Sequence, residues 1–288
     1  MKRLCLFLLI ASMVGHYCHA SNQIVLYAKP ESVKDQRNEY FIALLTLALS
    51  KTNNQINTIQ LQRATRPMQQ GRAIVELAQN RGIDVIWSVT SLEREKQLLP
   101  IRIPLLKGLL GYRVAIIRAA DKDKFAAVTS IENLRKLSAG QGHDWPDTKI
   151  LIANKIRVMT SSTYSGLFAM LENKRFDFFP RGVTEAWQEL AMLKNPKLLI
   201  EDSLLFYYPS PIYFFVNKMN QILANRIEEG LKHAIDDGSF EQLFISFPEH
   251  KKMFASVNIK QRKLITLFNP LLPPLTPLDN NKLWFQFK

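Results

Sequence analysis

The stretch from 138 to 187 decides the fold: SAGQGHDWPDTKIL occupies residues 138–151, and RVMTSSTYSGLFAMLENKRFDFFPRGVTEAW occupies residues 157–187. Its pattern predicts a strand, a loop, a helix, a strand, a second helix, a strand and a loop. Ser161 and Ser162 can cap the second helix by accepting its free backbone N–H groups. One apolar stripe with helical spacing follows, formed by Tyr164, Leu167, Phe168 and Leu171.

Two loops of this stretch should lie at a ligand-binding edge. Phe176–Phe179 is predicted to be a short buried strand that Pro180-Arg181-Gly182 breaks. The loops Gln141–Trp145 and Arg181–Glu185 would therefore both follow strands. In an open α/β sheet, ligands bind in the crevice outside the carboxyl ends of the strands.

The N-terminal part of the chain repeats the alternation of strand and helix. Ile24–Ala28 is an almost continuous apolar run, which is typical of a parallel strand buried on both faces. A helix over 35–50 and a strand over 57–62 follow. Thr65 should cap the next helix with Pro67 in its first turn, and Asp84–Trp87 should form a third strand. This order predicts a doubly wound α/β lobe.

Four motifs carry a resemblance to a known family. LENKRFD (171–177), after its Ser/Thr-rich cap, resembles the second lobe of type II periplasmic solute-binding proteins, the amino-acid-binding components of ABC importers (extracellular solute-binding family 3). GQGHDWPD (140–147) and FPRGVTEAW (179–187) are similar to a less characterised proteobacterial branch of that family. GLKHAIDDGSFEQLF (230–244) resembles the last helices of such proteins.

The resemblance implies a two-lobed α/β fold in which each lobe is a doubly wound sheet. Lobe one would comprise 21–117 and 212–288, and lobe two 118–211. Leu110–Ile117 and Ile212–Asn217 would form a two-strand hinge that lets the lobes close on ligand. The proline-rich tail from Phe268 is expected to pack as an extended strap over lobe one, with peptide recognition as the alternative.

The N-terminus has the order of a secretory signal. Lys2 and Arg3 precede the apolar run 4–14, and a small-residue site ends at Ala20. We therefore expect cleavage before Ser21 and a periplasmic protein. Cys5 and Cys18 both lie in the signal, so the mature chain should form no disulfide and hold no thiolate-bound metal. No metal or cofactor is expected.

The formal net charge of +13 limits the kinds of binding partner that we expect. A basic exported protein can meet a membrane surface or anionic solutes, but a solvated, solubilising surface explains the charge equally well. No basic run with interleaved aromatic residues occurs, so nucleic acid is not an expected partner. The expected partners are a small solute and an ABC permease or a sensor in the membrane, and the protein should be a monomer.

A further motif, WSVTSLER (87–94), follows the third predicted strand. Its Ser/Thr cluster followed by Arg94 resembles the first-lobe ligand loop of the family, whose arginine grips the ligand carboxylate. A guanidinium can donate two parallel hydrogen bonds to a carboxylate. The residues alone also allow another interpretation, in which Thr90 or Ser91 caps a helix and Arg94 is solvated.

The expected ligand is anionic or zwitterionic. The residues predicted to bind it lie at or just after strand ends and are Tyr27, Trp87, Ser88, Thr90, Arg94, Gln141, His143, Trp145 and Arg181. Arg181 stands where, by the resemblance, amino-acid binders often carry an acid for the ligand amine, which argues against an ordinary α-amino acid. Arg94 and Arg181 in one cleft should repel each other unless an anion lies between them. In the alternative, Arg181 pairs with Glu185 and never contacts ligand.

No catalytic motif occurs: GxSxG, HExxH and a Walker loop are absent. His143 with Asp144, and Glu185, are the only candidates for acid–base work, and a simple loop turn explains His143 and Asp144 as well. The sequence therefore predicts a binding protein that captures a solute and presents it to a membrane transporter. A periplasmic enzyme of the dehydratase or hydrolase type, or a ligand-binding partner of a separate sensor, are the alternatives.

Overall fold

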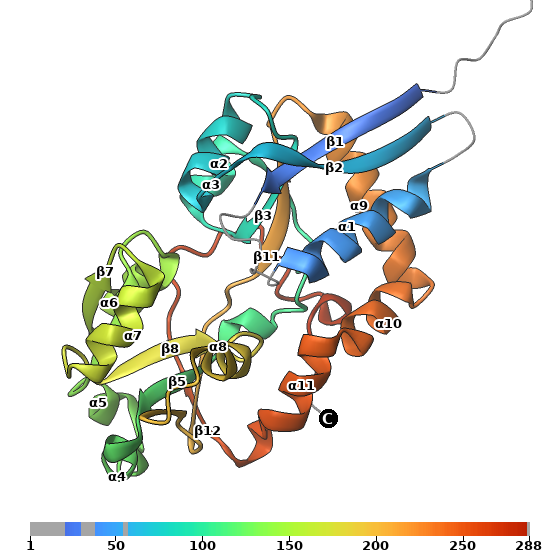
Figure 1. Cartoon of the computed structure of the whole chain (residues 1–288). Coiled ribbons are helices and arrows are strands. Elements are labelled where there is room, and N and C mark those ends of the chain that lie inside the picture. Colours follow the sequence, from blue (N-terminus) through green and yellow to red (C-terminus); the bar gives the residue numbers. More distant parts are fainter. Residues whose placement is uncertain (1–20, 30–37, 54–56, 287–288) are drawn as a thin grey trace, which may run out of the picture.

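The computed structural model describes residues 21–29, 38–53 and 57–286, which form two α/β lobes around two separate sheets (Figure 1). This arrangement confirms the predicted two-lobed α/β fold class. The predicted signal peptide, residues 1–20, lies outside the described residues. Within the described residues, no helix is both long enough and apolar enough to cross a membrane.

The first sheet lies in the upper lobe of Figure 1 and has the strand order β2-β1-β3-β11-β4. Its strands are β1 (Ser21–Lys29), β2 (Asn57–Pro67), β3 (Val85–Val89), β4 (Leu99–Ile101) and β11 (Ile212–Val216). Its helices are α1 (Glu39–Thr52), α2 (Gln70–Ala78), α3 (Leu92–Gln97), α9 (Gln221–Asp236), α10 (Ser239–Ser246) and α11 (Pro248–Ser256). β1 runs parallel to both of its neighbours, whereas β11 runs antiparallel to β3 and β4.

Alternation along β11 builds the core on both faces of this sheet. Phe214 and Val216 pack into the cluster that contains α1 and α9, while Tyr213 and Phe215 pack into the cluster beneath α2. Gly230 lets α9 approach α1 closely, because a Cβ there would lie 1.9 Å from the Ala48 carbonyl oxygen.

The second sheet has the order β12-β10-β5-β8-β6-β7, with β9 paired to β5. Its strands are β5 (Tyr112–Arg118), β6 (Ser138–Gly142), β7 (Arg157–Ser161), β8 (Phe178–Gly182), β9 (Leu198–Ile200), β10 (Leu204–Tyr207) and β12 (Lys263–Thr266). Its helices are α4 (Lys122–Ala126), α5 (Ile131–Leu134), α6 (Pro146–Ala153), α7 (Tyr164–Glu172) and α8 (Ala186–Leu193). Short 3-10 turns are η2 (Leu109–Gly111), η3 (Ala119–Asp121), η4 (Ile259–Gln261) and η5 (Asn281–Leu283).

The chain passes between the sheets through connections rather than through strands. β5 lies wholly in the second sheet and β11 wholly in the first, so the passages fall at 102–111 and 208–211. The chain also enters the second sheet again after α11, where β12 pairs parallel with β10. Residues 212–288 were predicted to belong to lobe one, and β12 departs from that boundary because Ile265 and Leu267 complete the apolar face over Phe206.

The C-terminal tail returns from β12 to the first lobe. The side chain of Asn154 holds Phe268 by two hydrogen bonds, donating to its carbonyl (2.7 Å) and accepting from its N–H (2.9 Å). The Leu271 carbonyl then accepts a hydrogen bond from the N–H of Leu92, at the start of α3. Further on, the Trp284 ring packs over Gly108. The tail is therefore held first by the second lobe, at Phe268, and then by the first lobe, at Leu92 and Gly108.

Several predicted local details differ in the structure. β2 continues to Pro67 and α2 begins only at Gln70, because β2 is an edge strand in which a missing N–H costs little. Residues 180–182 continue β8 instead of breaking it, and Pro180 is tolerated because only Phe178 of β8 pairs with β6. Thr163 caps α7 in place of the expected serines, since its hydroxyl accepts the Gly166 N–H.

Candidate functional site

A cleft of about 460 Å³ opens between the two lobes. Its walls come from the carboxyl ends of β3 in the first sheet and of β6, β7 and β8 in the second. The structure brings six of the predicted binding residues to these walls: Trp87, Ser88, Arg94, His143, Trp145 and Arg181. Their contact with a ligand stays a prediction. Each residue lies near the carboxyl end of a strand in one of the two sheets, and the two sheet edges face each other across the cleft.

The other three predicted residues do not line the cleft. Tyr27 is buried behind Trp87, with ring centroids 6.0 Å apart. The Thr90 hydroxyl donates to the Glu95 carboxylate at 2.7 Å, inside the lobe. Gln141 is fully buried, and its amide donates to the Pro180 carbonyl. In this structure the three side chains contact other protein groups beside the cleft, and their contact with a ligand stays a prediction.

Aromatic rings form much of the first-lobe wall. Trp87 stacks on Phe41 at 5.6 Å between centroids, and its indole N–H donates to the Asn38 side chain at 3.0 Å. Ser88, beside it in β3, is buried, and no described residue provides a hydrogen-bond partner for its hydroxyl. A buried hydroxyl without a partner is costly, so a ligand atom or water bonded to Ser88 would be favourable.

Arg94 is held in place on the same wall. Ser91 caps α3 by accepting the Arg94 N–H, which agrees with the helix-cap interpretation. The guanidinium itself is not simply solvated, since Nη1 donates to the Val89 carbonyl (2.6 Å) and Nη2 to the Gln70 side chain (2.9 Å). Burial lowers the pKa of Arg94. Two of its five N–H donors are thus used, and the other three have no hydrogen-bond partner among the described residues.

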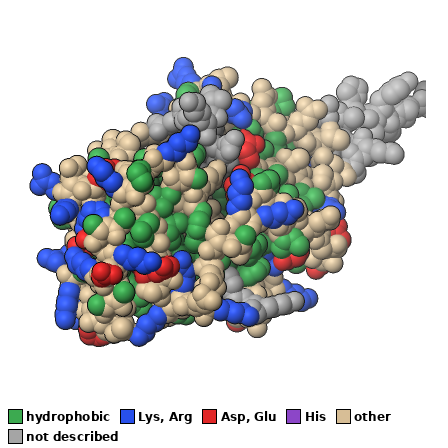
Figure 2. Space-filling view, turned by 60° about the horizontal axis from the view of Figure 1, so that its bottom comes forward, with side chains coloured by type: hydrophobic (Ala, Val, Ile, Leu, Met, Phe, Trp, Pro, Cys, Tyr) green, Lys and Arg blue, Asp and Glu red, His purple; other side chains and the backbone are tan. Residues whose placement is uncertain are grey.

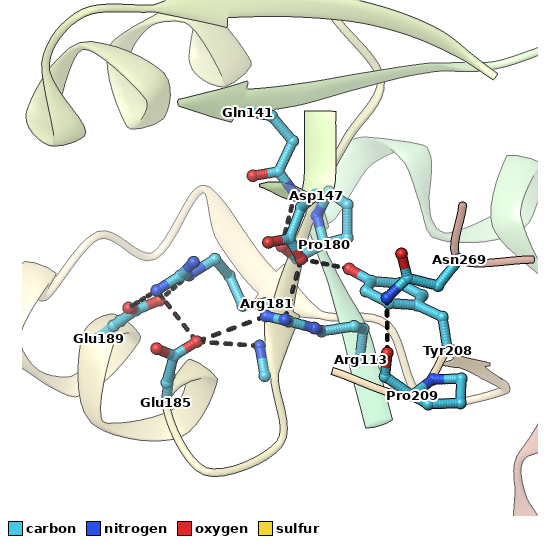
Figure 3. A network of polar contacts seen from close by, with 11 residues as sticks. Arg113, Gln141, Asp147, Pro180, Arg181, Glu185, Glu189, Tyr208, Pro209 and Asn269 are labelled. Atoms are coloured by element: carbon cyan, nitrogen blue, oxygen red, sulfur yellow. Dashed lines mark hydrogen bonds and ion pairs between the residues drawn. The ribbon is translucent and has the colours of Figure 1, made fainter. Parts of the chain in front are cut away.

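Arg181 is buried at the floor of the cleft on lobe two, where carboxylates surround it (Figure 3). Its Nε and Nη2 donate to the two Glu189 oxygens at 2.8 Å and 2.5 Å, and Nη2 also lies 3.1 Å from Glu185. Burial lowers the pKa of Arg181, but these carboxylates outweigh burial and raise its pKa well above the ordinary value. The predicted alternative pair with Glu185 is present, and Glu189 is the closer partner.

A second buried arginine, which sequence reasoning missed, lies beside it. Arg113 at the start of β5 pairs with Asp147 at 2.9 Å, and the Tyr208 hydroxyl donates to the same carboxylate oxygen (Figure 3). Burial raises the pKa of Tyr208 well above its ordinary value, so this hydroxyl stays protonated. The three residues come from β5, α6 and the 208–211 passage. Only their position before or after predicted strands could have indicated this cluster.

The two walls of the cleft carry opposite net charges. Among the described lining residues, Lys29 and Arg94 give the first-lobe wall a charge of +2. The lobe-two wall holds two arginines, Arg113 and Arg181, against three carboxylates, Asp144, Asp147 and Glu185. Its net charge is therefore −1, and Glu189 adds a further buried carboxylate behind Arg181. Arg181 is paired with carboxylates of its own lobe, which reduces the repulsion expected between Arg181 and Arg94 across the cleft.

The acid–base candidates His143, Asp144 and Glu185 all line the cleft. His143 and Asp144 are both more than half exposed, and their side chains are 3.9 Å apart. Trp145 stacks on Phe179 at 6.2 Å, and the Arg181 guanidinium lies 5.0 Å from its ring. Among the described residues, no group of three His, Cys, Asp or Glu is arranged to hold a metal ion. The lobe-two wall therefore combines charged and aromatic side chains.

Comparison with solved structures places the fold. An ancestral arginine-binding protein bound to arginine is 18% identical, with a TM-score of 0.55, covering 80% of this chain and 100% of the other. A putative ABC transporter binding component from Wolinella succinogenes complexed with lysine is 15% identical, with a TM-score of 0.58. The match covers 78% of this chain and 94% of the other.

A histidine kinase sensor domain with similarity to periplasmic binding proteins is 15% identical, with a TM-score of 0.57. The match covers 80% of this chain and 97% of the other. No family model and no curated protein matches the chain. The chain thus has the two-lobed fold of periplasmic amino-acid-binding proteins of ABC transporters, as the sequence resemblance implied.

Proposed function

We propose that the protein is a periplasmic binding protein that captures a small zwitterionic solute between its lobes and presents it to an ABC transporter. The observation that carries this proposal is the pair of oppositely charged walls facing each other across the cleft. A solute with one anionic and one cationic group would satisfy both walls at once. A solute of a single charge would satisfy one wall and be repelled by the other.

The carboxylate of the solute is assigned to the first lobe. Arg94 is held by Val89 and Gln70, so its free N–H donors are preorganised to grip an anionic group. The unpaired hydroxyl of Ser88 supplies a further hydrogen bond. Trp87 provides an apolar face against which the body of the solute can pack.

Export and the membrane partner belong to the same proposal. Cleavage before Ser21 would release the mature protein into the periplasm as a monomer with no cofactor. Its expected partner is an ABC permease. If the signal is cleaved as proposed, mass spectrometry of the protein from its native envelope should find Ser21 as the first residue. The likeness to a sensor domain supports a second candidate, in which the same closed form is presented to a sensor in the membrane.

An enzymatic role on this fold is less well supported. General acid–base catalysis needs groups within hydrogen-bond reach of a reacting atom. His143 and Asp144 are exposed on the rim, and Glu185 is engaged with arginines. We therefore propose binding without turnover, and an unchanged solute recovered after long incubation with the protein is the corresponding check.

A thermal-shift screen tests the function. The mature protein is heated with each of a set of amino acids, betaines, amines and carboxylic acids. A solute at one hundred times its dissociation constant stabilises the folded protein by about 2.7 kcal/mol. The proposal is supported if a zwitterion stabilises the protein and calorimetry shows that one solute molecule binds to each protein molecule. Stabilisation by no solute of the set, or by singly charged solutes alone, contradicts it.

A further inference from the structure

Glu185 occupies an unusual position at the floor of the cleft. It precedes α8, and its Oε2 accepts the Gly182 N–H at 3.2 Å. The same oxygen lies 3.1 Å from Nη2 of Arg181 and 3.8 Å from Nη1 of Arg113, so one carboxylate bridges two guanidinium groups (Figure 3). Glu185 also lines both the cleft and a smaller cavity of about 80 Å³, so the residue borders open space in two directions.

The two arginines are neutralised without Glu185. Arg181 has the bidentate partner Glu189, whose side chain is 2% exposed, and Arg113 has Asp147, whose side chain is 8% exposed. Glu185 is 24% exposed and makes the longer contacts. It is therefore the surplus carboxylate of this cluster, and its departure from the arginines would leave two intact ion pairs.

We propose that Glu185 is the specificity-determining residue of the cleft, rotating away from the arginines to accept the cationic group of the bound solute. This inference rests on the proposed function. A cation beside Glu185 neutralises the surplus negative charge of the lobe-two wall, whereas a second anion there would increase it. An exchange of charged partners costs little when the groups left behind remain paired.

The proposal also explains how Arg181 is compatible with a cationic group nearby. By its charge alone, an arginine at this position argues against an amine-bearing solute. However, Glu189 binds both edges of the Arg181 guanidinium that face it, so little of its charge is presented to the cleft. The acidic function that this position lacks is then supplied four residues later in the chain, by Glu185.

The test compares matched solutes on matched variants. The probes are a set of zwitterions, comprising the common amino acids, 4-aminobutyrate and glycine betaine, each paired with the monocarboxylate that lacks its cationic group. Binding to the full mature protein is measured by calorimetry. Glu185→Gln keeps the side-chain size and can still accept the Gly182 N–H. Glu132→Gln is the control, because it makes the same substitution at a 68% exposed side chain of the same lobe, outside the cleft.

For wild type, at least one zwitterion should bind more tightly than its amine-free partner. Glu185→Gln should lose about 10- to 100-fold of its affinity for that zwitterion, the range expected for a charged hydrogen bond, with less than about 3-fold loss for the monocarboxylate. Glu132→Gln should match wild type, and thermal melts should show both variants folded.

The alternative outcomes separate the two proposals. If wild type prefers a zwitterion and Glu185→Gln keeps that preference, the role of Glu185 is wrong while the proposed function stands. If wild type binds monocarboxylates as tightly as zwitterions, no cationic subsite exists and the inference fails. If wild type binds neither kind of probe, the proposed function fails first, and the inference falls with it.

Discussion

Arg181 and Glu189 form a buried bidentate ion pair, with Nε 2.8 Å from Oε2 and Nη2 2.5 Å from Oε1. The pair joins β8 to α8 and lies under the floor of the cleft. Because both side chains are almost fully buried, the pair links the sheet to its covering helix more directly than it links the protein to a solute. This relationship changes what a substitution at Arg181 is expected to do.

We expect Arg181→Ala to destabilise the protein by about 3–5 kcal/mol, because it leaves the Glu189 carboxylate buried without its partner. Urea denaturation of the variant measures the loss. The double variant Arg181→Met/Glu189→Leu removes both charges and should recover most of the stability. A single variant as stable as wild type, with selectively weakened solute binding, would return Arg181 to the role of a ligand clamp.

Arg94→Ala should reduce the affinity for the solute found in the thermal-shift screen by more than about tenfold, since a charge-assisted hydrogen bond is lost. Calorimetry measures the affinity, and circular dichroism checks the fold. Arg72→Ala is the matched control, because Arg72 is exposed on α2 and pairs only weakly with Glu76 at 3.5 Å. Equal affinity in the Arg94 and Arg72 variants would show that the carboxylate binds elsewhere.

Gly230→Ala should destabilise the first lobe by about 1–3 kcal/mol, because the added Cβ would overlap the Ala48 carbonyl and push α9 away from α1. The same substitution at Gly71, on the exposed side of α2, meets no atom within 4 Å. Gly71→Ala should therefore change stability by less than about 0.5 kcal/mol. Thermal melts of the two variants test the close helix packing, and similar melting temperatures would contradict it.

Asn154 and Asn173 offer a comparison that isolates the strap. Each asparagine ends a helix and donates from Nδ2 to the carbonyl four residues earlier, but only Asn154 also holds both backbone groups of Phe268. Asn154→Ala should cost about 1–3 kcal/mol more than Asn173→Ala, since it leaves partly buried backbone groups unpaired. Proteolysis of the tail should also accelerate only in the Asn154 variant. Equal stability and equal cleavage rates would mean that the strap is held by other contacts.

His250 predicts a pH dependence of stability. Its ring is buried beside Tyr40 and Phe244, with Nδ1 2.8 Å from the Phe244 carbonyl, and burial lowers its pKa. The unfolded chain therefore binds the proton more readily, so this contribution to stability is complete above about pH 6.5 and falls as the pH drops below it.

Urea denaturation at pH 7.5 and pH 5.5 measures this effect. The loss of stability between the two should be smaller in His250→Asn than in wild type. His233→Asn, at an exposed position of α9, should keep the wild-type dependence. An unchanged slope in His250→Asn would assign the pH dependence to other groups.

The sequence predicted most elements because their signals are local. The apolar stripe of α7 and the amphipathic pattern of α9 follow from helical spacing, and Ile212–Val216 follows from strand composition. Local signals failed where a neighbour from elsewhere in the fold decides. Pro67 and Pro180 suggest breaks, yet both lie in strands that have room for a missing N–H.

The candidate site was predictable in place but not in detail. Trp87 and Arg94 lie at or just after the end of a strand of the first sheet, and Arg181 lies near the end of a strand of the second, so each sheet edge could be predicted from the sequence. That the two edges face each other across one cleft depends on how the lobes are arranged. Which way a side chain points within that edge depends on register. Thr90 and Gln141 were expected in the cleft, and both face inward instead.

The sequence by itself therefore determined two α/β lobes, the order of most of their elements and the edge at which a ligand would bind. Only the tertiary structure decided the charge of that edge. Tyr208, just after β10, bonds to Asp147 from 61 residues away in the chain, and Arg113 in β5 pairs with the same carboxylate. They meet because the sheet order places β5 between β10 and β8. Ion pairs between distant segments leave no periodic trace in the chain, since their energy depends on distance and burial, which only the folded packing sets.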